Sequence, residues 1–147
     1  MKTQVAREDP MEIARILSIV VLAYVGFVAL MEVVIGSIQP SMEGGVRLTT
    51  VNAEGRKSDR TLFGARMEGK LYVASNHWLR GWYNRALASP IVDVDVDGVR
   101  GAYEAVPVEG EERARLADTY KMGFVLRFLC GFAPSKFLRL DPLAPSA

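Results

Sequence analysis

The residues best suited to chemistry in this 147-residue chain form a short basic turn at residues 55–60. A glycine is followed there by three cations, a hydroxyl and an acid: Arg56, Lys57, Ser58, Asp59 and Arg60. Guanidinium and ammonium groups beside free backbone N–H donors bind phosphate or carboxylate oxygens. The turn therefore predicts an anion site. A solvated hairpin tip, or a basic patch on anionic lipid headgroups, is the alternative.

A second stretch, at residues 75–85, mixes polar and aromatic side chains densely: Ser75, Asn76, His77, Trp78, Arg80, Trp82, Tyr83, Asn84 and Arg85. Aromatic faces can stack on a planar ring while hydroxyl, amide and imidazole groups orient it. The stretch joins a predicted strand to a predicted helix, where functional loops are common. The alternative is that Trp82 and Tyr83 pack in the core and that His77 is an ordinary hydrogen-bonded residue.

Two motif matches are rejected because their context is wrong. Residues 64–70 match most of a phosphate-binding P-loop, but Leu71 stands where the motif needs Ser or Thr, and the region predicts a hairpin. A calcium-loop pattern, D-x-D-x-D-G-x5-E, is formed by Asp93, Asp95, Asp97, Gly98 and Glu104. Valines alternate with these acids, which predicts a strand with solvent-facing carboxylates, so we expect no metal site.

Short strands separated by turns position these residues. We expect strands at residues 46–51, 61–67, 71–75, 91–97, 99–108 and 137–140, with tight turns at 68–70 and 97–98. Helices are expected at residues 79–88 and from 111 to about 130, the second with acids early and cations late. Together these elements predict an α+β fold, a small β-barrel of about six strands with two packing helices.

The N-terminal region contains a long apolar segment. No charged residue lies between Ile16 and Met31, and Glu32 is the first to interrupt the run. A helix of this length spans roughly the ~30 Å hydrocarbon core of a bilayer. We therefore expect a polar tail at residues 1–12 and a transmembrane anchor helix at 13–38. A cleaved signal peptide and a buried or interfacial helix are the alternatives.

Composition limits the function classes. A formal net charge of +1 argues against a general nucleic-acid binder. One cysteine and one histidine exclude an internal disulfide and a Cys-rich or multi-His metal centre. The length after the anchor suits one domain, at residues 46–142, followed by a tail at 143–147. More cations precede the anchor than follow it closely, which by itself favours a cytoplasmic N-terminus.

An ordered set of segments resembles one family. It comprises L-T-T-V-N-A-E-G-R-K-S at residues 48–58, L-Y-V-A-S-N at 71–76, W-Y-N-R-A-L-A-S-P at 82–90, a valine-rich strand with a D-G turn, and E-E-R-A-R-L at 111–116. Together they resemble the deazaflavin (F420)-dependent nitroreductase family of the FMN-binding split β-barrel group. The resemblance covers about residues 46–142 and implies a split barrel with a cofactor site between strands.

The resemblance also implies which residues bind the acidic end of the cofactor. Arg56, Lys57 and Ser58 would bind the phosphate and glutamate tail of F420, and Arg60 stands where the family often has another basic residue. Arg85 stands where the family usually has asparagine, and we include it among the cofactor-binding candidates. Because of such departures, FMN and the absence of any cofactor stay alternatives to F420.

The ring of the cofactor would be bordered, on the same resemblance, by Ser75, Asn76 and Trp82. His77 joins these candidates because it begins a bulkier loop than the family has. Family members often place a tyrosine in the late helical region, which points to Tyr120 as the catalytic donor to an oxygen that gains negative charge.

We therefore expect a single-pass membrane oxidoreductase that transfers hydride from reduced F420, or a flavin, to a quinone or nitro-type acceptor. Because F420 and its reductants are expected inside the cell, the resemblance favours a cytoplasmic catalytic domain, against the charge count. A non-catalytic, membrane-anchored cofactor-binding or membrane-interaction module is the alternative. The sequence leaves the oligomeric state open, and a homodimer is one arrangement that it allows.

Overall fold

The computed structural model describes residues 10–37 and 45–143. The elements in chain order are α1 (Pro10–Ser37), β1 (Gly45–Val51), β2 (Lys57–Met67), β3 (Lys70–Ser75), α2 (Gly81–Ala88), β4 (Ile91–Val96), β5 (Val99–Pro107), α3 (Gly110–Thr119), α4 (Phe124–Leu129) and β6 (Lys136–Pro142). Most of the predicted polar tail, the end of the predicted anchor at residue 38 and residues 144–147 lie outside the described residues.

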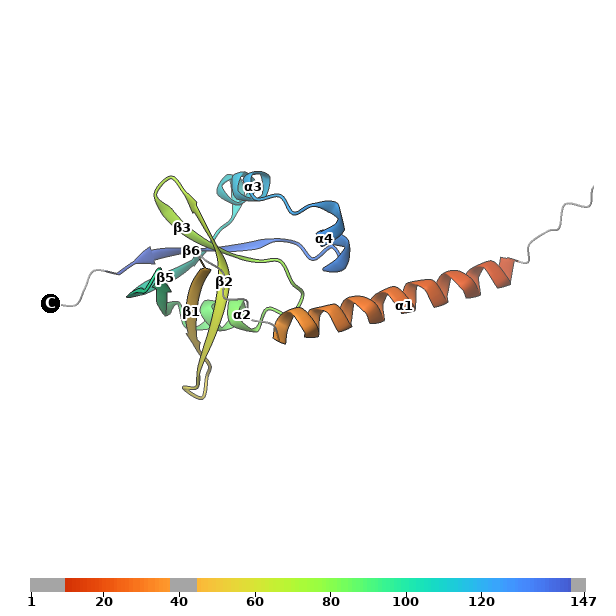
Figure 1. Ribbon diagram of the computed structural model, residues 1–147, viewed down its shortest axis with the longest axis horizontal. Helices are drawn as coiled ribbons and strands as arrows, with labels where there is room; N and C mark the ends of the chain where they lie inside the picture. The colour runs from red at the N-terminus through yellow and green to blue at the C-terminus, as the bar shows by residue number, and fades with distance from the viewer. Residues whose placement is uncertain (1–9, 38–44, 144–147) are drawn as a thin grey trace, which may run out of the picture.

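The six strands form a closed antiparallel barrel in the order β1-β2-β3-β6-β5-β4 (Figure 1). This confirms the predicted fold class. β2 is long enough to take part in two pairings: residues 57–63 pair with β1 and residues 64–67 pair with β3. The strand begins four residues earlier than predicted, so Lys57 and Arg60 lie on β2 rather than in a turn.

Two tight turns confirm the predicted hairpins. Glu68 and Gly69 have φ of 53° and 76°, and Asp97 and Gly98 have φ of 52° and 82°. Two consecutive positive φ values define the hairpin turn that Asp-Gly sequences favour. The segment resembling a P-loop is therefore a β2–β3 hairpin. Of the calcium-like acids, Asp93 and Asp95 lie on β4, Asp97 lies in the following turn and Glu104 lies on β5. Asp95 Oδ1 accepts the Gly98 N–H of that turn at 3.1 Å.

The barrel interior is filled by alternating strand residues together with one face of α2. Trp82, Tyr83 and Ala86 of α2 join the buried strand residues, among them Val46, Leu48, Val73, Val92, Val94, Leu138 and Leu140. α2 lies against β1 and β5 and so closes one end of the barrel. α3 packs on the outside through Leu116, which joins a second cluster with Tyr72 and Phe137.

The single helix predicted from residue 111 to about 130 is wrong, because the chain forms two helices there. Backbone geometry leaves the helical region at Tyr120 (φ −109°, ψ 48°) and at Gly123 (ψ 154°). Glycine weakens a helix by about 1 kcal/mol relative to alanine. The two halves also differ in polarity, since α3 is strongly charged and α4 is almost wholly apolar. The break lets the charged α3 and the apolar α4 point in different directions, which one straight helix would not allow.

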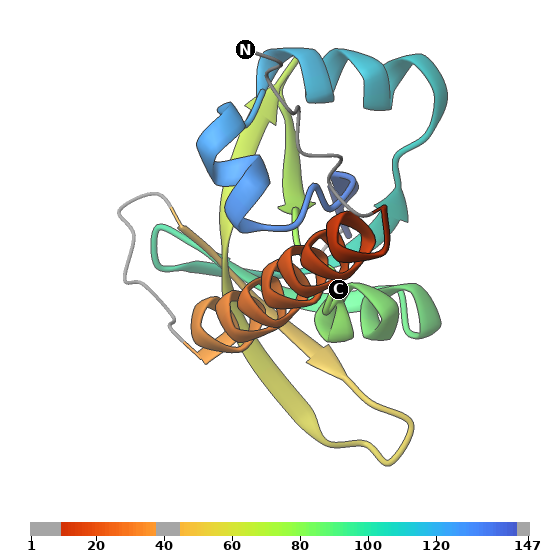
Figure 2. The ribbon, with the colours of Figure 1, turned by 90° about the vertical axis from the view of Figure 1, so that its right-hand side faces the viewer.

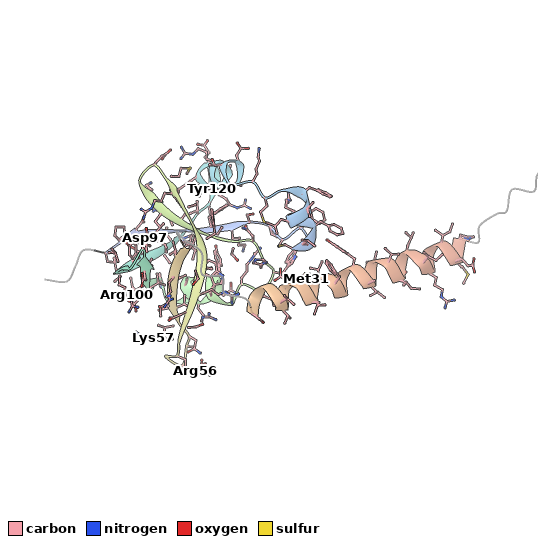
Figure 3. All side chains as sticks on the ribbon, viewed as in Figure 1. Met31, Arg56, Lys57, Asp97, Arg100 and Tyr120 are labelled. Atoms are coloured by element: carbon pink, nitrogen blue, oxygen red, sulfur yellow. The ribbon has the colours of Figure 1, made fainter. Side chains whose placement is uncertain are left out.

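α1 extends away from the barrel (Figure 1). Its segment Pro10–Val34 is long and apolar enough to cross a bilayer. Almost all of its described side chains are exposed, and Glu32 is the buried exception among them. Figure 3 shows Met31 where the helix meets the domain.

Candidate functional site

A tight turn between β1 and β2 carries the basic residues. Asn52 Oδ1 accepts the N–H of Arg56 at 2.8 Å, and the N–H of Asn52 donates to the Arg56 carbonyl at 3.0 Å. Gly55, at φ +75°, supplies the left-handed residue that the turn requires. The turn therefore fixes the backbone from which Arg56 and Lys57 project.

Arg85 reaches this turn from α2. Its Nε donates to Thr50 Oγ1 at 3.0 Å and its Nη2 donates to Ser58 Oγ at 3.3 Å. A pocket of about 230 Å³, which we call the anion cradle, is lined by Asn52, Arg56, Lys57, Ser58 and Arg85. The lining holds three cations and no acid, so its potential favours an anion. Four residues predicted from the sequence are thus brought together.

The two exposed cations of the anion cradle are only loosely paired. Arg56 Nη2 lies 3.8 Å from Glu54 Oε2, and Lys57 Nζ lies 3.7 Å from Asp93 Oδ2. The side chains of Arg56 and Lys57 are 79% and 69% exposed. Ion pairs of this kind contribute little because water and salt screen them. Both cations can therefore turn toward a ligand at low cost.

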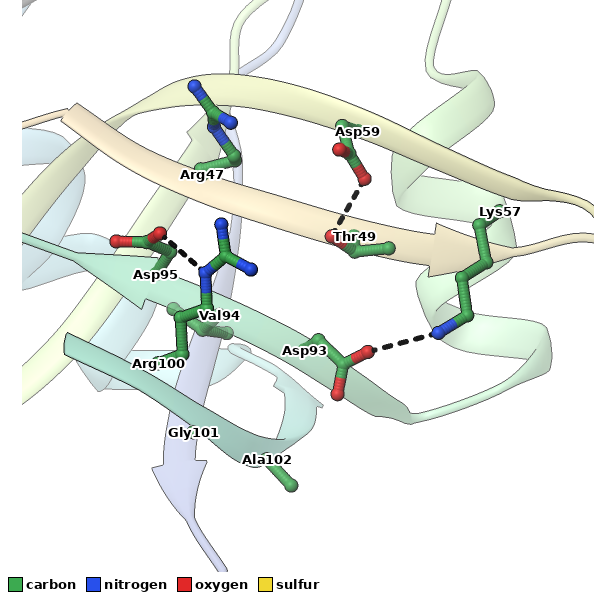
Figure 4. Close-up of a pocket in the computed structure, with 10 residues that line it drawn as sticks. All are labelled: Arg47, Thr49, Lys57, Asp59, Asp93, Val94, Asp95, Arg100, Gly101 and Ala102. Carbon is green, nitrogen blue, oxygen red and sulfur yellow. Dashed lines mark hydrogen bonds and ion pairs between the residues drawn. The ribbon is translucent and has the colours of Figure 1, made fainter. Parts of the chain in front are cut away.

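A larger polar pocket adjoins the anion cradle on the outer face of the barrel (Figure 4). Its volume is about 450 Å³, and it shares Lys57 with the anion cradle. Its charges are balanced, with cations at Arg47, Lys57 and Arg100 and acids at Asp59, Asp93 and Asp95. Arg100 Nε donates to Asp95 Oδ2 at 3.0 Å, so part of this charge is already paired. The two pockets together offer room for an elongated ligand.

Ser75 and Asn76, at the end of β3, carry unsatisfied polar atoms. Ser75 Oγ and Asn76 Oδ1 are buried and have no hydrogen-bond partner among the described residues. A buried polar atom without a partner costs about 1–3 kcal/mol, and such atoms call for an explanation. Both residues stay candidates for contacts with a bound ligand.

The other cofactor-binding candidates have different surroundings. Trp82 is only 6% exposed and meets Tyr83 edge to face in the barrel core. His77 Nδ1 lies 3.3 Å from Glu32 Oε1 of α1. Arg60 is half-buried on β2, opposite Leu48, and is not among the residues that line the anion cradle. Their roles at the cofactor stay predictions.

Tyr120 lies at the opposite end of the barrel from Arg56 and Lys57 (Figure 3). Its hydroxyl donates to the Arg66 carbonyl at 3.0 Å, and its ring meets Phe63 edge to face. A ligand that contacts both ends must therefore be elongated.

A polar network that the sequence did not predict lies on the outer face of β3 and β6. Tyr72 Oη donates to Glu112 Oε1 at 2.7 Å, and Arg139 pairs with both Glu112 and Asp141. Burial and the bond to Glu112 raise the pKa of Tyr72 to about 12. The same bond, with the Arg139 charge, holds the pKa of Glu112 below its usual value despite burial. The network fastens α3 to the barrel.

Comparison with known families decides the class of the protein. A family model for F420H2-dependent quinone reductases matches residues 27–124. The chain belongs to this family. It is an oxidoreductase that uses reduced F420, as the sequence resemblance implied.

Solved structures share the fold of this F420H2-dependent oxidoreductase at low sequence identity. An F420-H2 dependent reductase, FDR-A, is 22% identical over 65% of this chain and 93% of its own, with a TM-score of 0.50. The heme storage protein HutZ from Vibrio cholerae is 16% identical over 69% and 83%, with a TM-score of 0.51. A NimC/NimA family protein from Clostridium acetobutylicum is 18% identical over 67% and 73%, also with a TM-score of 0.51. No curated protein matches the chain.

The residues present fit an acidic cofactor that carries a polar ring. The anion cradle provides cations for an acidic tail, and its loosely held side chains are free to reorient. The unsatisfied Ser75 Oγ and Asn76 Oδ1 provide polar atoms for a ring edge.

Three residues that hold parts of the candidate site were not predicted from the sequence. Thr50 and Asn52 hold Arg85 and the turn, and Glu32 holds the loop after Asn76. The alternation of Val46, Leu48 and Thr50 on one face of β1 was a usable signal for Thr50, because it places a hydroxyl among inward residues. For Glu32 the signal was a carboxylate inside an apolar run, since such charges are expensive and functional.

Proposed function

We propose that this chain is a membrane-anchored reductase that transfers hydride from reduced F420 to a lipophilic quinone. The observation that carries the proposal is the anion cradle, in which Arg56, Lys57 and Arg85 surround a pocket lined by no acid. The family match supports the acceptor class. The apolar helix α1 supports a position beside lipid-soluble acceptors.

The residues of the chain bind and orient the cofactor. Arg56 and Lys57 would leave their exposed ion pairs and bind the phosphate and carboxylate groups of the tail. Arg85, held by Thr50 and Ser58, would present a fixed guanidinium to the same groups. When bound, reduced F420 supplies the hydride, and the protein supplies position and electrostatics.

The ring would be oriented near Ser75 at the end of β3, and the acceptor near Tyr120, beside the β2–β3 hairpin at the start of that strand. Ser75 Oγ and Asn76 Oδ1 would gain hydrogen bonds to the ring edge. Tyr120 would donate a proton or hydrogen bond to the quinone oxygen that gains negative charge. The hydroxyl would donate its hydrogen bond to the acceptor oxygen instead of the Arg66 carbonyl, while the contact with Phe63 keeps the phenol ring in place.

The catalytic domain would face the cytoplasm. The three basic residues before the apolar run at Ile16–Met31, Lys2, Arg7 and Arg15, favour the opposite orientation. Arg127 lies on α4, with Lys121 before this helix and Lys136 after it, and these cations would meet the anionic cytoplasmic leaflet. The supply of reduced F420 inside the cell supports the same side.

Proteoliposomes test this function. The full chain would be supplied with reduced F420 and a lipid-soluble naphthoquinone, and oxidised F420 would be followed by absorbance. We expect turnover, with kcat/KM for F420H2 lowered about tenfold or more in Arg85→Ala. Arg115→Ala, an exposed arginine of α3, is the matched control and should leave the rate unchanged. F420H2 oxidation by nitroaromatic acceptors alone would contradict the quinone assignment.

A further inference from the structure

α4 presents an apolar surface that the domain does not cover. None of its six residues is buried. Phe124 and Val125 are 73% and 71% exposed, and Leu126, Phe128 and the following Phe132 are also exposed. Large apolar side chains clustered this densely on a surface mark a site of interaction with protein or lipid.

The same surface is in direct contact with α1 (Figure 2). The Tyr24 ring of α1 packs against the Phe128 ring at a tilt of 31°, with ring centroids 4.8 Å apart, and the Tyr24 hydroxyl donates to the Phe128 carbonyl at 2.8 Å. Trp78 Nε1 donates to the Gly131 carbonyl at 3.2 Å, beside Val28 of α1. The apolar surface of α4 is therefore continuous with the apolar surface of the anchor.

The length of α1 indicates how deeply the apolar surface of α4 would lie in a bilayer. The part of α1 before Tyr24, residues 10–23, is about 21 Å long at the usual helical rise, whereas a hydrocarbon core is about 30 Å thick. The remaining thickness must lie along residues 24–31, up to the buried Glu32. Those are the residues that α4 and Trp78 flank. If α1 crosses the bilayer, α4 enters it.

A groove between α1 and the domain fits the same surroundings. Its volume is about 470 Å³ and its lining is almost wholly apolar, consisting of Tyr24, Val25, Val28, Ala29, Glu32, Val33, Trp78, Leu79 and Gly131. A groove of this composition at the level of a bilayer suits an acyl chain.

The charges around α4 complement an anionic leaflet. No aspartate or glutamate occurs between Asp118 and Asp141, whereas four cations lie in that interval. Lys121 pairs with Asp118 and Arg139 with Glu112 and Asp141, so Arg127 and Lys136 are the cations offered to the leaflet. Aromatic rings beside exposed cations are typical of segments at the level of lipid headgroups. Arg127 lies over the Phe132 ring, 5.9 Å from its centroid, so the cation is placed next to an apolar side chain.

We propose that α4, with Phe132, Trp78 and Leu79, is a second membrane-binding surface that inserts among the acyl chains of an anionic phospholipid leaflet. The proposal rests on the membrane anchoring included in the proposed function. It places the catalytic domain partly in the bilayer rather than at the end of a tether.

Depth-dependent fluorescence quenching tests this surface. Single cysteines would be introduced as Val125→Cys on α4, Ile19→Cys on α1 and Val99→Cys at the β4–β5 turn. Val99 is 73% exposed and Val125 is 71% exposed, so the two valines are matched in side chain and accessibility. The full chains would be labelled with an environment-sensitive dye and reconstituted in vesicles containing phosphatidylglycerol and acyl-chain nitroxide lipid. The unsubstituted chain, whose Cys130 is buried, gives the labelling background.

We expect the labels at residues 125 and 19 to be quenched several-fold more strongly than the label at residue 99. Quenching at residue 19 without quenching at residue 125 would overturn the proposal and leave the anchor intact. Absence of quenching at residue 19 would overturn the membrane anchor and the proposal together. Trp78, 55% exposed, gives a second readout in the otherwise unmodified chain, because brominated acyl chains should quench its fluorescence and Trp78→Phe should remove that loss.

Discussion

Glu32 of α1 lies 3.3 Å from His77 of the loop after β3, although 45 positions separate the two residues. The Glu32 carboxylate also accepts the backbone N–H groups of Trp78 and Leu79, each at 3.2 Å. A buried carboxylate is stable when hydrogen bonds replace its hydration. α1 is thereby joined to the loop that follows Asn76, one of the candidate cofactor contacts.

Glu32→Ala is expected to release this loop from α1. Two backbone N–H groups lose a charged acceptor, a loss worth about 1–3 kcal/mol. Amide hydrogen exchange at residues 76–80 should accelerate about tenfold or more, read by mass spectrometry of the solubilised full chain. Glu32→Gln keeps an acceptor oxygen and should give a smaller change. Glu12→Ala, the other acidic position of α1, is the control, and equal acceleration in that variant would contradict the account.

Gly131→Ala is expected to disturb the contact between α1 and the domain. A Cβ there would lie 2.6 Å from Val28 Cγ1, at a backbone φ of +59°. Gly69, at φ +76°, has open space around a Cβ, so Gly69→Ala carries backbone strain of about 1 kcal/mol without the clash. Denaturant unfolding in detergent should show a larger loss of free energy for Gly131→Ala, by about 1 kcal/mol. Equal losses would mean that α1 does not pack there.

Tyr72→Phe is expected to change the alkaline limit of stability. The pKa of Tyr72 is raised from 10.0 to about 12, so the folded state holds this proton more tightly than the unfolded state. Its contribution is therefore complete below pH 10 and is lost as the pH rises toward 12. The free energy of unfolding should fall more steeply across that interval in the native chain than in Tyr72→Phe. Parallel curves would contradict the Tyr72–Glu112 bond.

Tyr120→Phe is expected to lower kcat with little change in the affinity for reduced F420. Loss of a positioned proton donor reduces rates by about a hundredfold or more, while the retained ring preserves the contact with Phe63. Steady-state kinetics with a quinone acceptor and an independent F420 titration separate the two quantities. An unchanged kcat would exclude the donor role.

The barrel was predictable because its signals are local. Alternating valines around Asp93 and Asp95 and the turn at Asp97–Gly98 each specify a hairpin without reference to the rest of the chain. The break between α3 and α4 was not predictable in the same way. Both halves have helical sequences, and only the structure shows that the charged half packs on the barrel through Leu116 while the apolar half stays exposed.

The candidate site likewise has a part that local sequence predicts and a part that depends on the fold. The basic turn at Arg56 and Lys57 could be identified from composition, because cations beside glycine are suited to anions whatever the fold. The partners that hold Arg85 lie 35 and 27 positions away, so only the closed barrel reveals them. The contact of His77 with Glu32 likewise depends on how α1 packs against the domain.

Equilibrium titration of the solubilised full chain with F420, followed by fluorescence quenching, tests the central claim most directly. The double variant Arg56→Ala/Lys57→Ala removes two cations from the anion cradle, and Lys70→Ala/Arg115→Ala removes the same two residue types from exposed positions outside it. We expect F420 to bind the native chain and the second variant alike, and the cradle variant to bind about tenfold or more weakly. Equal affinity in all three, or binding of FMN and not F420 by the native chain, would contradict the account.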